Sequence, residues 1–231
     1  LSLLVISAAA VAAFLWLPLR WARVAPPPGA TLDLAYFVAL GLGYILLEVA
    51  FIQQFILFLG NPVYALTVVV FVMLASSSAG ALWGRRHHTC LCMRLVVTGI
   101  VVLVGVYLWG LAGWLGGWVG MPFAARLLIA IGLLFPLAFL QGLPFPAGIR
   151  WLAASGPETV AWAWAVNAAA SVLGSVLAMV IAIHWGMAAA LAAGAAAYCA
   201  AGALTFRYNS RHAAMLRQEA AMGTQTEAAR A

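Results

Sequence analysis

Seven long apolar runs limit what this chain can fold into. They cover roughly residues 1–19, 32–59, 62–83, 95–117, 124–143, 160–184 and 187–206. About 20 apolar residues cross the hydrocarbon core of a bilayer as a helix, whereas barrel strands are about half as long and alternate in polarity. A helix also satisfies its backbone polar groups internally, as the bilayer interior requires. We therefore expect an all-α, polytopic integral membrane bundle of about seven transmembrane helices.

The composition leaves little room for anything else. Hydrophobic residues make up 67% of the 231 residues and charged residues 7%, and the mean hydropathy of +1.09 lies outside the range of soluble domains. We expect a first transmembrane helix at 1–19, a proline-rich cytoplasmic linker at 20–31, a six-helix membrane bundle at 32–206 and a cytoplasmic tail at 207–231. The first run lacks the basic start of a signal peptide, so we expect that it is retained and that further residues precede Leu1.

The arginines predict the orientation of the bundle. All eleven basic residues are arginines, scattered between the runs, which is not the pattern of a nucleic-acid surface. When successive connections are assigned to alternate sides, Arg126 lies alone on one side and the other arginines share the opposite side. The positive-inside rule then predicts an external N-terminus and a cytoplasmic C-terminus.

Glu48 is the least expected residue in the apolar runs. It lies near the middle of its run, where an ionised carboxylate costs at least about 2.5–3.5 kcal/mol, and Tyr44 lies one helical turn before it on the same face. No arginine lies at its depth, so we expect Glu48 to be protonated at neutral pH and to donate a hydrogen bond to a facing helix. Two interpretations stay open: a proton or cation site, or a structural hydrogen bond.

Other polar residues in the runs are candidates for a binding site or for helix contacts. Gln53 and Gln54 point about 100° apart, and we expect them to hydrogen-bond neighbouring helices. Gln141 and Asn167 lie at similar depth, so a small polar pocket between their two helices is an alternative to packing.

Residues 162–182 carry a stripe of small and polar side chains. Small residues at helical spacing allow close approach of two helices, and an asparagine can hydrogen-bond across the contact. The stripe therefore predicts helix packing; its members are Asn167, Ser171, Gly174, Ser175 and Ala178.

Two short segments predict how helices end. In "GNP" (60–62), Gly60 can adopt the left-handed conformation, Asn61 can cap the next helix and Pro62 suits its first turn, which predicts a tight antiparallel hairpin. In "GLPFPAGIR" (142–150), two prolines predict that the helix stops and that irregular backbone follows.

No segment predicts a metal, a cofactor or catalysis. "RRHHTCLC" (85–92) has histidines and cysteines, but their spacing matches no usual zinc pattern, and His184 has no partner for haem ligation. Three cysteines are too few for a disulfide framework, and no phosphate loop or catalytic triad is found. We expect no cofactor and no catalytic residue in this chain.

Three blocks of the sequence resemble a known family. "GLGYILLEVAFIQQFILFLGNPVYALTVVVFVMLASSSAGAL", "GLPFPAGIR" and "WAWAVNAAASVLGSVLA" resemble the membrane portion of bacterial spermidine-synthase-like fusion proteins, in which an aminopropyltransferase-like Rossmann domain is joined to transmembrane helices. The family has arginine and histidine where this chain has Gln54 and Asn61, whereas Glu48 and Gln53 match. The resemblance implies a multi-pass protein of the bacterial inner membrane, here without the catalytic domain.

These observations favour a non-catalytic membrane domain. We expect an anchor or accessory subunit that contacts the lipid bilayer and either other membrane subunits or copies of itself, and not nucleic acid. The alternative is a domain that binds or transports a small molecule, a proton or a cation at Glu48.

Overall fold

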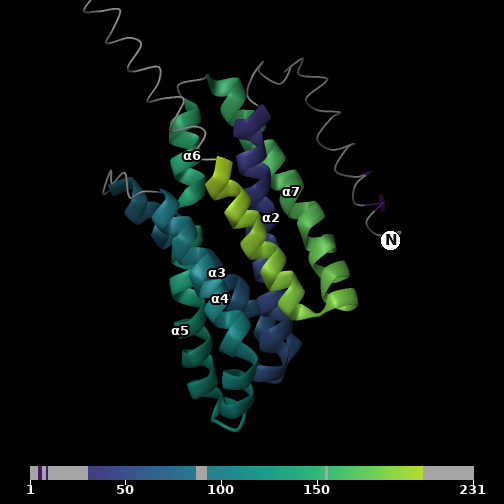
Figure 1. Ribbon diagram of the computed structural model, residues 1–231. Helices are drawn as coiled ribbons and strands as arrows, with labels where there is room; N and C mark the ends of the chain where they lie inside the picture. Colours follow the sequence, from purple (N-terminus) through teal and green to yellow (C-terminus); the bar gives the residue numbers. More distant parts are fainter. Residues whose placement is uncertain (1–4, 7–8, 10–30, 87–92, 154–155, 205–231) are drawn as a thin grey trace, which may run out of the picture.

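The chain forms a bundle of long helices. The computed structural model describes residues 5–6, 9, 31–86, 93–153 and 156–204, and all regular structure among them is helical (Figure 1). The labelled helices are α2 (Thr31–Leu59), α3 (Pro62–Arg86), α4 (Met93–Trp118), α5 (Phe123–Gln141), α6 (Pro144–Leu152) and α7 (Pro157–Trp185). A further helix covers Met187–Leu204 and is called here the 187–204 helix.

Six helical segments of the described residues are long and apolar enough to cross a membrane, with α5 and α6 together forming one of them. The predicted all-α membrane bundle is thereby confirmed. Only residues 5, 6 and 9 of the predicted first helix are described, and the linker before Thr31 and the tail beyond Leu204 lie outside the described residues. The seventh helix and the orientation stay predictions.

The most buried helix is α2. Of the most apolar 18 residues in each spanning segment, 61% are buried in α2 and 17–33% in the others. Among the labelled helices, its most extensive contact is with α7, and it also contacts α3, α4, α5 and α6. The 187–204 helix reaches it too, because the Tyr198 ring packs directly on Gly43. Polar groups near the middle of α2 are therefore surrounded by several other helices.

The hairpin between α2 and α3 has the predicted turn. Gly60 has a φ of +78° and ends α2, and the Asn61 side chain accepts a hydrogen bond of 2.8 Å from the Val63 N–H. Arg126 of α5 donates to the Phe58 carbonyl at 2.7 Å, which satisfies a free carbonyl at the end of α2. We call this end of the bundle, which also holds the turns at 119–122 and 186, the Gly60 end; the opposite end is the Thr31 end (Figure 1).

The expectation of irregular backbone at 142–150 is wrong. The helix breaks only at Gly142 and Leu143 and resumes as α6, because Pro144 and Pro146 lie in its first turn, where no intrahelical N–H is needed. A Cβ on Gly142 would lie 1.9 Å from the Ser77 carbonyl, and one on Gly80 would lie 2.0 Å from the Phe139 carbonyl. These glycines let α3 and α5 approach backbone to backbone beside the break.

Candidate polar site inside the bundle

Glu48 lies in the bundle interior. It is 8% exposed on α2, and Tyr44, one turn earlier, is close enough for its hydroxyl to interact electrostatically with the carboxyl. The Tyr44 hydroxyl also approaches Ser77 of α3, but the two do not reach hydrogen-bond geometry, and the hydroxyl is buried without a partner. Glu48, Tyr44 and Ser77 thus form one side of a polar site between α2 and α3.

Gln141 and Tyr198 form the other side of the same site. The Tyr198 hydroxyl lies near the Gln141 side chain and also interacts with the Tyr44 hydroxyl, which connects the two sides. Gln141 is 5% exposed, and neither its amide nitrogen nor its amide oxygen has a hydrogen bond of ordinary geometry. Tyr36 marks the edge of the site toward the Thr31 end, and its hydroxyl donates to the Pro144 carbonyl at 2.9 Å.

These groups lie deep in the membrane. Counting about 1.5 Å per residue from the Gly60 end, Glu48 lies about 16 Å along α2, and Tyr44 and Ser77 lie about 22 Å along α2 and α3. The Tyr198 ring packs on Gly43, which places it at the level of Tyr44. A hydrocarbon core is about 30 Å thick, and helices as long as these extend past it at both ends. The site therefore lies near the middle of the bilayer.

The site combines an acidic group with unpaired polar atoms. Glu48 is buried, and no cationic side chain among the described residues compensates its charge. A buried donor or acceptor without a partner costs about 1–3 kcal/mol, and here a tyrosine hydroxyl and a whole carboxamide are in that state. The predicted donor bond from Glu48 to a facing helix stays a prediction.

The stripe on α7 lies at a helix contact. Asn167 donates from its amide to the Phe37 carbonyl at 2.9 Å, and Ser171 donates to the Asn167 carbonyl at 3.0 Å. A Cβ on Gly41 would lie 2.5 Å from the Asn167 carbonyl, and one on Gly174 would lie 2.4 Å from the Ile45 side chain. This close packing of α2 on α7 is what small residues allow.

The remaining two stripe residues form no hydrogen bond to another helix within the described part of the chain. Ala178 is fully buried, and Ser175 donates to the Val172 carbonyl of its own helix at 2.8 Å. The alternative of a polar pocket shared by Gln141 and Asn167 is wrong, because Asn167 bonds to α2 whereas Gln141 lies beside Tyr198.

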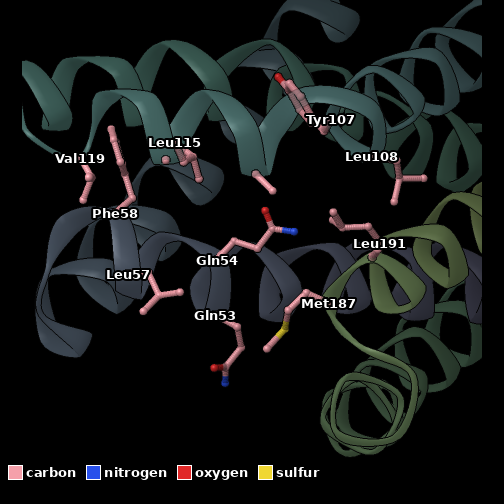
Figure 2. A pocket seen from close by; sticks show the side chains of 13 residues that line it. Gln53, Gln54, Leu57, Phe58, Tyr107, Leu108, Leu115, Val119, Met187 and Leu191 are labelled. Atoms are coloured by element: carbon pink, nitrogen blue, oxygen red, sulfur yellow. The ribbon is translucent and has the colours of Figure 1, made fainter.

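Gln53 and Gln54 lie elsewhere. Both line a cavity of about 430 Å³ toward the Gly60 end, and Figure 2 shows the Gln54 amide directed into the space between α2 and α4. Neither forms the predicted hydrogen bond to another helix within the described part of the chain. The position of a glutamine along a predicted helix does not show whether its side chain contacts another helix or lines a cavity.

The metal and haem candidates find no support as sites. Residues 87–92, with the paired histidines and two cysteines, lie outside the described residues. His184 is exposed and its Nδ1 lies 2.9 Å from the Val180 carbonyl, with its ring 5.7 Å from that of Trp185. Over the described ranges, no group of three or more metal-ligating side chains is found.

Sequence reasoning missed Ser77 and Tyr198. Tyr198 is a single tyrosine in a helix of mostly alanine and glycine, and it is 1% exposed. A lone large polar side chain in such a helix is a signal that could have suggested it. Ser77 is one of three consecutive serines, and nothing in the run indicates which one faces Tyr44.

Comparison with known proteins adds no relative: no family model, no curated protein and no solved structure matches this chain.

Proposed function

We propose that the chain is a membrane-embedded binding domain whose central site holds a proton or a small monovalent cation at Glu48. One observation carries this proposal: Glu48 is buried with no compensating cation among the described residues, beside the unpartnered Tyr44 hydroxyl, and Tyr198 connects this pair to the unpartnered Gln141 carboxamide. An ionisable residue inside the membrane is by default a candidate functional site, and ion pathways and proton relays are among the sites that such residues mark.

The residue types suit a cation better than an anion or a sugar. A carboxylate supplies a full negative charge, the Gln141 amide supplies a carbonyl oxygen, and the Tyr44 and Tyr198 hydroxyls can accept as well as donate. Oxygen ligands of this kind hold hard cations and the N–H groups of ammonium ions. No described arginine competes for the carboxylate.

Charge balance sets the exchange that the site performs. Without a cation, Glu48 is neutral as the protonated acid, because an unpaired carboxylate is costly at this depth. When a cation M⁺ binds, Glu48 releases its proton, so that Glu48–COOH and M⁺ give Glu48–COO⁻·M⁺ and H⁺. The net charge of the site is the same before and after, which keeps the cost of burial low.

The test is proton release on cation binding. Purified protein in weakly buffered detergent solution is mixed with Na⁺, K⁺ or methylammonium, and released protons are followed with a pH dye. We expect about one proton per chain with the preferred cation, none in Glu48→Gln, and unchanged release in Glu158→Gln, which removes an exposed carboxyl at the start of α7. Absence of release with every cation, while infrared spectra show Glu48 ionised throughout, would overturn the proposal.

An anchor or accessory-subunit role in the bacterial inner membrane is the second candidate. It is favoured by α4, where Gly105, Gly113 and Gly117 are exposed with nothing near their Cβ positions. Such faces suit close contact with a helix of another subunit. Stoichiometric co-purification of a second membrane protein from native membranes, lost in Gly113→Leu, would support this role; a stable monomer without associated chains contradicts it.

We also propose that the chain is related to spermidine-synthase-like membrane proteins, and that its N-terminus is external and its C-terminus cytoplasmic. The resembling blocks include the Glu48 side of the site and the α2–α7 contact. In a cysteine-free background, labels at residues 85–94 and beyond Arg207 should react only from the cytoplasm, and a label at Asn61 only from outside. Reaction of both regions from one face contradicts the seven-helix topology.

A further inference from the structure

A second site lies away from Glu48, in the cavity that Gln53 and Gln54 line. Its walls come from three helices: the last turns of α2, the second half of α4 and the start of the 187–204 helix (Figure 2). The volume of about 430 Å³ is within the range of small-molecule sites. The cavity opens at the surface, where Leu57 is exposed, and three helices line it. An occupant therefore contacts protein on several sides, unlike a lipid that touches one helix face.

The lining is apolar apart from a few groups. Leu108, Leu115 and Leu191 are typical of its walls, and none of the described residues that line it is acidic or basic. The Tyr107 hydroxyl is already used, because it donates to the Leu133 carbonyl of α5. The carboxamides of Gln53 and Gln54 are the polar groups that remain, so the site fits an uncharged polar group joined to hydrocarbon.

The depth of Gln54 identifies the polar group. As a helix of 29 residues, α2 is about 43 Å long, whereas the hydrocarbon core is about 30 Å thick. Gln54 lies about 7 Å before the end of α2, and this is the level at which hydrocarbon gives way to the polar region of the leaflet. In a glycerolipid, the ester carbonyls lie at that boundary and accept hydrogen bonds but donate none.

We infer that the cavity binds a glycerolipid of the leaflet at the Gly60 end. One acyl chain lies along the leucine-rich walls toward Tyr107, and an ester carbonyl accepts a hydrogen bond from the Gln54 amide. The absence of charged side chains in the lining means that the head group is not selected by charge. Among the labelled helices, α4 contacts α5 more extensively than α2, and the bound lipid fills the space that separates the end of α4 from α2.

Glycine positions on α4 provide a matched pair of variants. Gly116 lines the cavity and Gly113 does not, and a Cβ at either position would meet nothing within 4 Å. Gly116→Phe therefore fills the cavity without a clash in the protein, whereas Gly113→Phe adds the same side chain to the same helix outside it. Gln54→Leu removes the proposed donor and keeps the size of the side chain.

The experiment is photolabelling in vesicles of phosphatidylcholine that carry a small fraction of lipid with a mid-chain diazirine. We expect labels concentrated on α2, α4 and the 187–204 helix around the cavity, reduced about tenfold in Gly116→Phe, severalfold in Gln54→Leu and unchanged in Gly113→Phe. Uniform labelling of all lipid-facing helices, equal in the four proteins, would overturn the inference. A long-chain quinone that abolishes the label at equimolar amounts would assign the cavity to a free amphiphile instead.

Discussion

Two polar regions inside the bundle have opposite properties. At the α2–α7 contact, the Asn167 amide bonds to the Phe37 carbonyl and the Ser171 hydroxyl bonds within α7, and glycine brings the backbones together. At the site around Glu48, the Tyr44 hydroxyl and the Gln141 carboxamide are buried without partners. Amide and hydroxyl groups therefore hold helices together in the first region, whereas in the second region they have hydrogen-bonding atoms that no protein group uses.

The difference indicates where function lies. A polar group that is satisfied by backbone stabilises the bundle by about 0.6–2 kcal/mol and leaves nothing for a ligand. A buried polar group without a partner destabilises the protein. Such a group is therefore expected where a ligand supplies the missing hydrogen bond, or where a proton is exchanged for a cation. The two regions should respond to mutation in opposite directions.

The largest loss of stability is expected from Gly41→Leu, which places a large side chain at the α2–α7 contact. Its side chain would enter space that the Asn167 carbonyl and the Ser171 hydroxyl already occupy, so α2 and α7 must separate at a cost of about 3 kcal/mol or more. Thermal unfolding in detergent should show the loss. Gly105→Leu on α4 is the control, because its Cβ meets nothing within 4 Å; equal losses in both variants would show that the α2–α7 contact is loose.

Carboxamide variants compare the two regions directly. Asn167→Leu removes an interhelical bond and should lower the free energy of unfolding by about 0.6–2 kcal/mol. Gln141→Leu removes two unpaired polar atoms and should leave stability unchanged, or raise it by about 1 kcal/mol, in buffer free of the cation. Both are measured by reversible unfolding in mixed micelles. If Gln141→Leu costs as much as Asn167→Leu, the Gln141 amide has a partner and the proposed site is a packing contact.

Sequence predicted the helices well for a physical reason. Length and apolarity decide whether a segment spans a bilayer, and the predicted bounds of 32–59 and 160–184 agree with Thr31–Leu59 and Pro157–Trp185 within a few residues. The error at α6 came from treating prolines only as helix breakers. Pro144 and Pro146 instead begin a helix, where they cost nothing.

The candidate site was predicted only along one helix. Helical periodicity places Tyr44 and Glu48 on one face, and desolvation predicts that this face turns inward. Which helices oppose that face depends on packing between segments far apart in sequence. Ser77 and Tyr198 could therefore not be found, and Gln141 was paired with Asn167 on depth alone.

Two tyrosines of α2 offer a smaller and sharper comparison. The Tyr36 hydroxyl donates to the Pro144 carbonyl, so Tyr36→Phe should cost about 1 kcal/mol of stability. The Tyr44 hydroxyl has no hydrogen-bond partner, so Tyr44→Phe should change stability by less than about 0.5 kcal/mol. The same Tyr44→Phe protein should bind the cation severalfold more weakly in the proton-release assay. A Tyr44→Phe protein with lower stability and unchanged cation affinity would make Tyr44 a structural residue.

The smallest change in stability is expected at Glu48 itself. Glu48→Gln keeps the size and the hydrogen-bonding groups of a neutral carboxyl, so fold and stability should be unchanged within about 0.5 kcal/mol, whereas Glu48→Leu should weaken the packing of neighbouring polar groups. Infrared spectra should show a protonated carboxyl band that disappears in Glu48→Gln and that decreases in the wild-type protein when the cation binds. The response to the cation distinguishes a binding site from a structural hydrogen bond. A purely structural acid gives a band that disappears in Glu48→Gln but does not change when the cation is added. If Glu48→Gln also retains cation binding, the charge of the carboxylate is not what holds the ligand, and Glu48 belongs with Asn167 among the packing residues.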